Sequence, residues 1–277
     1  MKKFGFGTMR LPLIDSQDKS SIDMEELKKM VDEFMAAGFT YFDTAFTYHE
    51  QLSESVLKEA LVDRYDRDSY IFADKMPTVL VKSGDEYPMY FNKQLEKTGV
   101  GYFDYYLMHN MGRDRYFNTH KWGGFDFARR MKEEGKIKKF GFSFHDDAEM
   151  LDQILTEHPE VDFVQLQINY LDWENKIIQS RACYETARKY NKPIVVMEPV
   201  KGGTLANLPK EADSMLYEYA PGVLPVSYAL RFAASLPGVF MVLSGMSSLE
   251  QVKDNIHIMD NPAPVSYTHL RAHETRG

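Results

Sequence analysis

The sequence predicts a single-domain α/β protein, a (β/α)8 TIM barrel, on three observations. Eight short apolar runs rich in β-forming residues alternate with longer helical patterns over almost the whole chain. Several runs are apolar at consecutive positions, which is typical of strands buried on both faces of a parallel sheet. The chain has 277 residues, 44% of them hydrophobic, and single α/β barrels commonly have about 250 residues. A doubly wound sheet is the alternative, but eight strand–helix units in this length favour the barrel.

The predicted strands are short segments separated by helical patterns and turns. In chain order they cover residues 3–9, 40–45, 69–76, 102–110, 138–144, 161–168, 193–199 and 239–246. Amphipathic helices are predicted at 24–38, 146–158, 176–190 and 247–259. In the first helix, Leu27, Met30, Val31 and Phe34 fall on one face, and Gly38 is a suitable end.

Composition excludes several classes of partner. The formal net charge of −8 argues against binding to nucleic acid or to an anionic membrane. No apolar run has the length of a membrane span, and the N-terminus lacks the apolar core of a signal peptide. Cys183 is the one cysteine, so the chain can form no internal disulfide and no cysteine metal cluster. We expect a cytoplasmic protein without a metal site.

The C-terminal segment is interpreted separately. Residues 265–275, VSYTHLRAHET, match the translation of a transposase sequencing-library adapter in one reading frame. We therefore predict a barrel over residues 1–264 and an adapter-derived tail over 265–277. His269 and His273 lie four apart in that tail, and on this interpretation they form no metal site.

Ionisable side chains stand near the ends of three consecutive predicted strands. Asp43, Lys75 and His109 occupy these positions, and Tyr48 follows Asp43 by five residues. Because functional residues of parallel barrels lie at the C-terminal ends of strands, we expect the four to converge on one mouth. A nearby ammonium lowers the pKa of a tyrosine, and a carboxylate keeps that ammonium charged. A histidine beside the tyrosine can orient a carbonyl oxygen.

The segments FDTAFTYH, ADK and LMHN resemble the catalytic segments of the aldo/keto reductase superfamily, and the resemblance covers residues 1–264. It implies that Asp43, Tyr48, Lys75 and His109 are catalytic. Tyr48 would give a proton to a carbonyl oxygen while a nicotinamide delivers hydride to the carbon. The resemblance thus predicts an NAD(P)-dependent oxidoreductase acting on a small carbonyl or alcohol substrate.

The same resemblance implies cofactor-binding positions, although no GxGxxG follows a strand. Gln165 matches the carboxamide-binding glutamine, with Gln167 as the alternative. The implied cofactor residues are Gly7, Thr8, Met9, Ser143, Gln165, Pro199, Val200, Lys201, Gly202, Gly245, Met246, Ser247, Gln251 and Asn255. Trp122 and Trp173 are candidates for the substrate wall.

Four positions depart from the common family pattern. Phe144 replaces an asparagine, and Glu198 stands where an aromatic residue usually stacks on nicotinamide. Gly245 and Gln251 stand where many members place cations against a 2′-phosphate. Ser247 or the helix start could hold the phosphate instead, so NADP(H) remains the first expectation and NAD(H) the second.

The segments MRLP, FGFSFHD, QLQINYLDWEN and MEPVKGG resemble the subgroup that carries a C-terminal ferredoxin-like extension with [4Fe–4S] clusters. The resemblance implies that the natural protein is longer and that the clusters lie in the extension. It leaves two alternatives to carbonyl reduction: a non-catalytic nicotinamide sensor, and an electron-transfer module working with the cluster domain. The oligomeric state is open.

Overall fold

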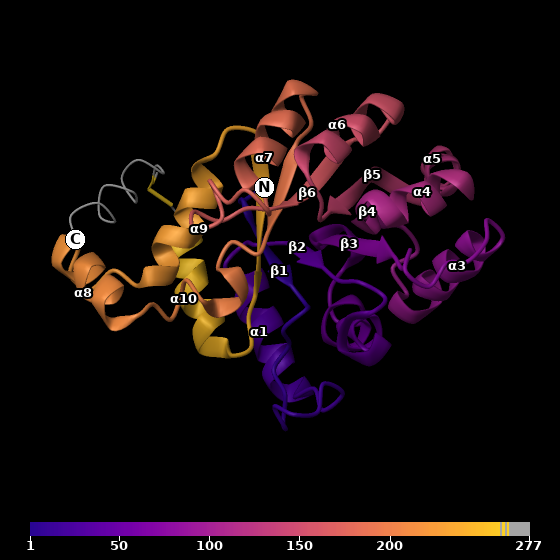
Figure 1. Cartoon of the computed structure of the whole chain (residues 1–277). Coiled ribbons are helices and arrows are strands. Elements are labelled where there is room, and N and C mark those ends of the chain that lie inside the picture. Colours follow the sequence, from indigo (N-terminus) through magenta and orange to yellow (C-terminus); the bar gives the residue numbers. More distant parts are fainter. Residues whose placement is uncertain (261, 264, 266–277) are drawn as a thin grey trace.

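The strands of the computed structural model, which describes residues 1–260, 262, 263 and 265, close into one barrel. Eight parallel strands pair in chain order, and β8 pairs with β1 to complete the ring (Figure 1). Their bounds are β1 Phe4–Gly7, β2 Tyr41–Asp43, β3 Ile71–Met76, β4 Phe103–Met111, β5 Ile137–Phe144, β6 Phe163–Gln167, β7 Ile194–Met197 and β8 Val239–Gly245. Each overlaps its predicted segment, so the predicted single-domain (β/α)8 barrel is confirmed. Of the predicted adapter-derived tail, all but Val265 lies outside the described residues.

Helices surround the strands, and α8 lies farther out than α9 and α10 (Figure 1). The α-helices are α1 Met24–Ala36, α2 Ser53–Leu57, α3 Glu86–Thr98, α4 Arg113–Lys121, α5 Gly124–Glu133, α6 Ala148–Glu157, α7 Ser180–Lys189, α8 Lys210–Tyr219, α9 Pro225–Ser235 and α10 Leu249–Asp260. Shorter helical turns are η1 Tyr48–Gln51, η2 Lys58–Val62, η3 Arg67–Ser69 and η4 Lys201–Gly203. In the described part of the chain, no helix has the length and apolar character needed to cross a membrane.

Local signals account for where the helices begin. The Asp23 side chain accepts the backbone N–H of Glu26 at 3.0 Å and so caps α1. Helix α7 begins at Ser180, and the prediction that it begins at residue 176 is wrong. The Asn175 side chain accepts the backbone N–H of Ile177 at 2.8 Å, which favours a turn over a helix at this point.

The interior of the barrel is filled at the N-terminal ends of the strands. Tyr41 and Phe163 are the first residues of their strands and belong to a buried cluster inside the ring. A Cβ at Gly141 would lie 2.5 Å from the backbone oxygen of Phe163, so only glycine allows this close packing. Tyr105 stacks on Phe240 with ring centroids 5.7 Å apart. The open end of the barrel is therefore the C-terminal end, where the ionisable residues lie.

Candidate active site

The ends of β2, β3 and β4 bring the four predicted catalytic side chains together at the mouth of the barrel. Asp43 ends β2, and Lys75 lies one residue before the end of β3. The Lys75 Nζ lies 2.6 Å from Asp43 Oδ1 and 5.0 Å from the centroid of the Tyr48 ring. The Tyr48 and His109 rings meet edge to face, with centroids 5.8 Å apart. Asp43, Tyr48 and His109 line one cavity of about 430 Å³.

A tight turn holds Tyr48 in place. The next three residues, His49, Glu50 and Gln51, have φ angles of 48°, 53° and 71°, a left-handed conformation that non-glycine residues rarely adopt. His49 fixes this turn because its Nε2 accepts the backbone N–H of Leu11 at 3.1 Å. Such strain is maintained only where the surroundings enforce it, and it concentrates at functional sites.

The charge of Lys75 is maintained by its neighbours. Burial alone would lower the pKa of Lys75, but the charges of Asp43 and Tyr48 outweigh it and raise the pKa. Burial also raises the pKa of the Tyr48 phenol, and the Lys75 ammonium opposes that rise without cancelling it. The prediction of a lowered tyrosine pKa is thus wrong on balance. Tyr48 holds its proton at neutral pH, as a proton donor must.

Desolvation at the mouth also determines the protonation of His109. It lowers the pKa of His109 well below the ordinary value of 6.5, and the nearby Lys75 charge lowers it further. Partial desolvation and the charge of Arg115 lower the pKa of His145, an exposed side chain that lines the same cavity. His109 is therefore a neutral imidazole that can donate one hydrogen bond.

We expect the protein to lose stability as the pH falls below 6.5, the ordinary pKa of histidine. The unfolded chain then binds a proton on His109 that the folded chain does not, so the stability present above this pH is lost as the pH falls towards the depressed pKa of His109. Urea unfolding at several pH values between about 8 and about 5 measures the slope. His109→Gln should flatten the slope, whereas His257→Gln, at an exposed position, should leave it unchanged. An unchanged slope in His109→Gln would contradict the assignment.

In the described part of the chain, a buried amide oxygen without a hydrogen-bond partner lies at the mouth cavity. Gln165 is 2% exposed, lines this cavity and has no hydrogen-bond partner for its Oε1 among the described residues. Ser143 is 1% exposed, lines the same cavity, and its Oγ accepts the backbone N–H of Asn110 at 2.7 Å. Gln167, the alternative to Gln165, lines a different cavity. A buried acceptor without a partner is costly in a folded protein, and a ligand N–H would satisfy it.

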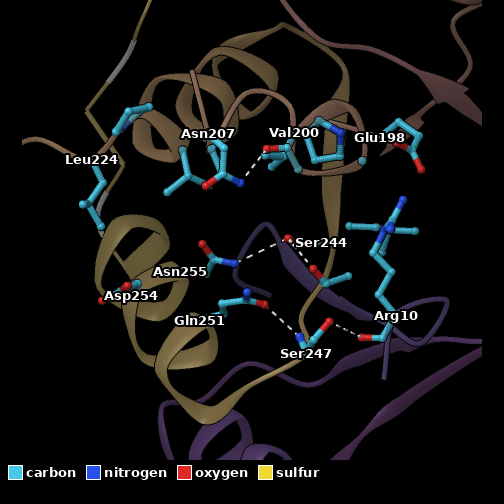
Figure 2. Close-up of a pocket in the computed structure, with 18 residues that line it drawn as sticks. Arg10, Glu198, Val200, Asn207, Leu224, Ser244, Ser247, Gln251, Asp254 and Asn255 are labelled. Carbon is cyan, nitrogen blue, oxygen red and sulfur yellow. Dashed lines mark hydrogen bonds between the residues drawn. The ribbon is translucent and has the colours of Figure 1, made fainter. Parts of the chain in front are cut away.

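A second cavity of about 430 Å³ adjoins the first on the side of β8 and α10 (Figure 2). The two cavities share Arg10, Glu198, Leu243 and Gly245 in their walls. Predicted cofactor residues at the mouth cavity, besides Ser143 and Gln165, are Gly7, Met9 and Gly245. Those at the second cavity are Pro199, Val200, Gly202, Gly245, Ser247, Gln251 and Asn255. Two joined lobes of this kind suit a ligand with two bulky ends.

Hydrogen bonds order one wall of the second cavity. The Gln251 Oε1 accepts the backbone N–H of Ser247 at 2.8 Å, and Asn255 Nδ2 lies 3.4 Å from the Ser244 hydroxyl (Figure 2). Asn255 is 5% exposed, so contacts within the fold determine the orientation of its side-chain amide.

Three predicted cofactor residues line neither cavity. Thr8 is fully buried, and its hydroxyl donates to the backbone oxygen of Asp43 at 3.0 Å. The Lys201 ammonium forms an ion pair with Asp172. Met246 is fully buried. These side chains support the walls, and they do not face the cavities.

The two tryptophans predicted for the substrate wall also lie elsewhere. Trp173 is 8% exposed and packs edge to face against Phe232, with ring centroids 5.4 Å apart. Trp122 follows α4 and packs partly buried against the core. Neither lines either cavity.

Arg10 is a functional candidate that the sequence analysis did not select. It lines both cavities, and its side chain extends towards Glu198 (Figure 2). A Cβ at Gly202 would lie 3.1 Å from its guanidinium, and one at Gly245 would lie 3.1 Å from its stem. The two glycines therefore leave room for the side chain. The signal in the sequence was the arginine of MRLP, directly after the first strand.

A closed parallel barrel with an ionisable cluster at the carboxyl ends of its strands defines a class of proteins that hold their active sites there. The sequence profile described as "Aldo/keto reductase family" matches residues 3–266, and the chain therefore belongs to the aldo/keto reductase family. It is an oxidoreductase, and the predicted resemblance is confirmed.

Solved structures of aldo/keto reductases have the same fold. The holo form of aldo-keto reductase AKR11C1 from Bacillus halodurans has 21% identity and a TM-score of 0.74, over 98% of this chain and 90% of that one. An aldo/keto reductase from Klebsiella pneumoniae in complex with NADP and acetate has 20% identity and a TM-score of 0.75, over 98% of this chain and 90% of that one. Another from Klebsiella pneumoniae, in complex with NADPH, has 18% identity and a TM-score of 0.74, over 98% and 89%. No curated protein matches the sequence significantly.

Proposed function

We propose that this protein reduces carbonyl compounds to alcohols, or oxidises the alcohols in reverse, with a nicotinamide cofactor and with Tyr48 as proton donor. The observation that carries the proposal is the buried Lys75–Asp43 pair beside Tyr48, at the wall of an open cavity. An ion pair with a purely structural role would not require a phenol and an imidazole beside it at the wall of a cavity. The small-molecule substrate would enter this mouth.

The residues present fit a nicotinamide dinucleotide. The unpartnered Gln165 Oε1 and the Ser143 hydroxyl would hold the carboxamide, and the second cavity would hold the adenosine end. Arg10 lies where the two cavities meet, so its positive charge would face the pyrophosphate. A reduced nicotinamide held by these residues would supply the hydride for the carbonyl carbon.

The protein side chains carry out the accompanying proton transfer. The neutral His109 donates a hydrogen bond to the carbonyl oxygen and orients it beside the Tyr48 hydroxyl. Tyr48 gives its proton to that oxygen, which completes the alcohol. The Lys75 ammonium stabilises the phenolate left behind, and Asp43 keeps Lys75 charged and in position.

NADP(H) remains our first choice of cofactor, because two of the similar solved structures contain NADP or NADPH. The Ser247 hydroxyl in the wall of the second cavity would contact the phosphate. NAD(H) is the alternative, because this cavity offers little positive charge for a 2′-phosphate. Arg10 is the one cation among the described residues that line it, and the acidic Asp254 lines it too.

Gln251→Arg tests this assignment of the second cavity. An arginine here would face the 2′-phosphate, so we expect about tenfold tighter binding of NADPH and little change for NADH. Fluorescence titration with both cofactors measures the ratio, and Gln251→Ala separates the added charge from the lost contact with Ser247. Equal changes in affinity for NADPH and NADH would mean that the 2′-phosphate does not bind beside residue 251.

A cofactor titration followed by a panel of carbonyl compounds tests the proposed activity. We expect NADPH or NADH to quench the intrinsic fluorescence and small aldehydes to be reduced with oxidation of the cofactor. Binding without turnover on any carbonyl would instead support a nicotinamide sensor. Oxidation with a ferredoxin or dye acceptor that survives Tyr48→Phe would support electron transfer.

A cytoplasmic location is part of the proposal, since the buried free thiol of Cys183 suits a reducing compartment.

A further inference from the structure

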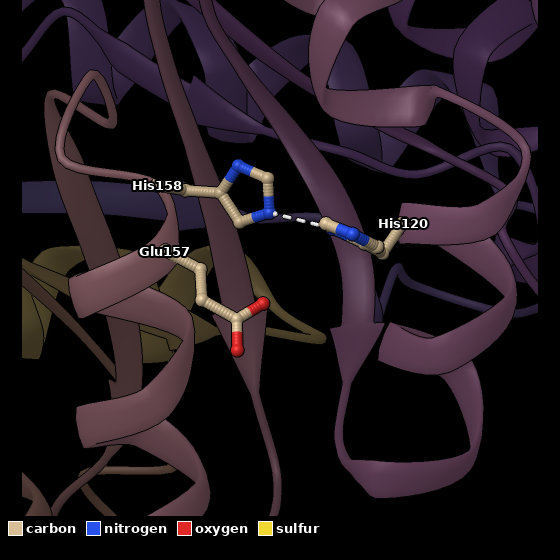
Figure 3. Close-up of side chains that lie close together, drawn as sticks. All are labelled: His120, Glu157 and His158. Carbon is tan, nitrogen blue, oxygen red and sulfur yellow. Dashed lines mark hydrogen bonds between the residues drawn. The ribbon is translucent and has the colours of Figure 1, made fainter.

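Three side chains with metal-binding atoms converge outside the barrel, away from the residues of the mouth. His120 lies in the last turn of α4, Glu157 ends α6, and His158 follows directly (Figure 3). One ligand atom from each side chain lies within 4.8 Å of the others. The His120 Nδ1 and the His158 Nε2 face each other at 3.3 Å.

The His158 ring is held in a fixed orientation. It is 9% exposed and stacks on Phe125, with ring centroids 3.7 Å apart and an angle of 12° between the planes. Its Nδ1 lies 3.1 Å from the Glu160 Oε1, and its Nε2 forms the hydrogen bond with His120 Nδ1 that a bound ion would replace. Histidines that bind metals usually donate their second ring nitrogen to a carboxylate or carbonyl in this way.

Glu157 is also held by neighbouring groups. The Tyr116 hydroxyl donates to its Oε2, and Gln153 Nε2 donates to its Oε1 at 2.8 Å. These two hydrogen bonds hold the Glu157 carboxylate in place. Each oxygen still has lone-pair capacity for a further partner.

The distance between the two ring nitrogens fits a tetrahedral ion. Zinc binds imidazole nitrogen at about 2.0–2.1 Å, so two such ligands at a tetrahedral angle lie about 3.3–3.4 Å apart. We propose that His120, His158 and Glu157 bind a divalent transition-metal ion of the Zn²⁺ type, with water as the fourth ligand. Two imidazoles and one carboxylate are a donor set that such ions accept. His120 and Glu157 are exposed, so the ion would enter from solvent.

The ion would join two helices that are already connected near the mouth. At the N-terminal ends of α4 and α6, the backbone N–H of Arg113 donates to Asp146 Oδ2 at 2.7 Å, and the Arg113 guanidinium lies 3.2 Å from Asp147. The proposed site joins the opposite ends of the same helices. Because α4 follows the strand that carries His109, the ion would brace this helix without taking part in catalysis.

Sequence spacing does not reveal this site, and the prediction from the sequence was that the chain has no metal site. His120 and His158 are 38 residues apart and lie on different strand–helix units. Only the packing of α4 beside α6 brings them together.

Metal titration of the full chain tests the proposal. The measurements start from chelator-treated protein and use Zn²⁺ by calorimetry and Co²⁺ by its visible absorption. His269 and His273 of the tail are first replaced by alanine, because an i,i+4 histidine pair can itself bind these ions. We expect one ion per chain, the intense absorption of tetrahedral Co²⁺, and a rise in melting temperature with added Zn²⁺.

His120→Ala and Glu157→Gln should each weaken binding at least tenfold. His120 is exposed, and glutamine can keep the contact of Glu157 with Tyr116, so neither change should prevent folding. His257→Ala, an exposed histidine on α10, is the matched control and should bind as tightly as the parent. Failure of the parent to bind either ion, or equal binding by parent and His120→Ala, would overturn the proposal.

Discussion

Tyr48→Phe should abolish carbonyl reduction while cofactor binding persists. Phenylalanine keeps the ring that meets His109 and lies near the Lys75 ammonium, and it removes the proton that the carbonyl oxygen needs. Loss of a positioned general acid costs about 10²–10⁴-fold in rate. The expected result is a fall in kcat of this size for small aldehydes, measured by the absorbance of the reduced cofactor.

The fluorescence titration provides the control for this variant. Because the Tyr48 hydroxyl does not belong to the proposed carboxamide contacts of Ser143 and Gln165, the cofactor dissociation constant should change by less than about threefold, or under 1 kcal/mol. A fall in kcat without a loss of binding identifies Tyr48 as the proton donor. Turnover equal to that of the parent protein would exclude this mechanism.

Lys75→Met should lower both activity and stability. The Lys75 ammonium is fully buried between Asp43 Oδ1 at 2.6 Å and the backbone oxygen of Thr44 at 2.7 Å. Removing one member of a buried ion pair leaves the other charge without compensation and typically costs about 3–5 kcal/mol. Urea unfolding followed by fluorescence should show a loss of this size, together with loss of aldehyde reduction.

The double variant Asp43→Asn/Lys75→Met separates the two effects. It removes the unpaired carboxylate, so part of the lost stability should return, because neither charge of this pair then stands without the other. Catalysis should stay absent, since no ammonium stabilises the Tyr48 phenolate. If Lys75→Met were as stable as the parent, the buried pair would not have the energetic role assigned here.

The barrel could be predicted from the sequence because the signals for its strands are local. Each strand is a short apolar run between turn residues, and parallel pairing brings all the strand ends to one edge. The convergence of Asp43, Lys75 and His109 could therefore be predicted from the sequence. The start of α7 was not predictable in the same way, because the turn at Asn175 competes with an uninterrupted helical pattern.

Properties that depend on the whole fold could not be predicted from the sequence. The pKa of Tyr48 depends on its desolvation in the folded barrel, which outweighs the ammonium beside it. Arg10 was not selected because its importance comes from two cavities that meet beside it, built from segments far apart in the chain. Trp122 and Trp173 are the opposite case, because they were predicted at the substrate wall and their side chains pack into the protein instead.

The aromatic packing that fills the N-terminal end of the barrel has a kinetic consequence. In the described part of the chain, that end is filled by packed side chains, among them Tyr41, Tyr105, Phe163 and Phe240. Substrate entry and product departure must then use the same opening, beside the cavity assigned to the dinucleotide. Product would compete with incoming substrate for this passage, so the rate of its escape sets an upper limit on turnover however fast the hydride moves.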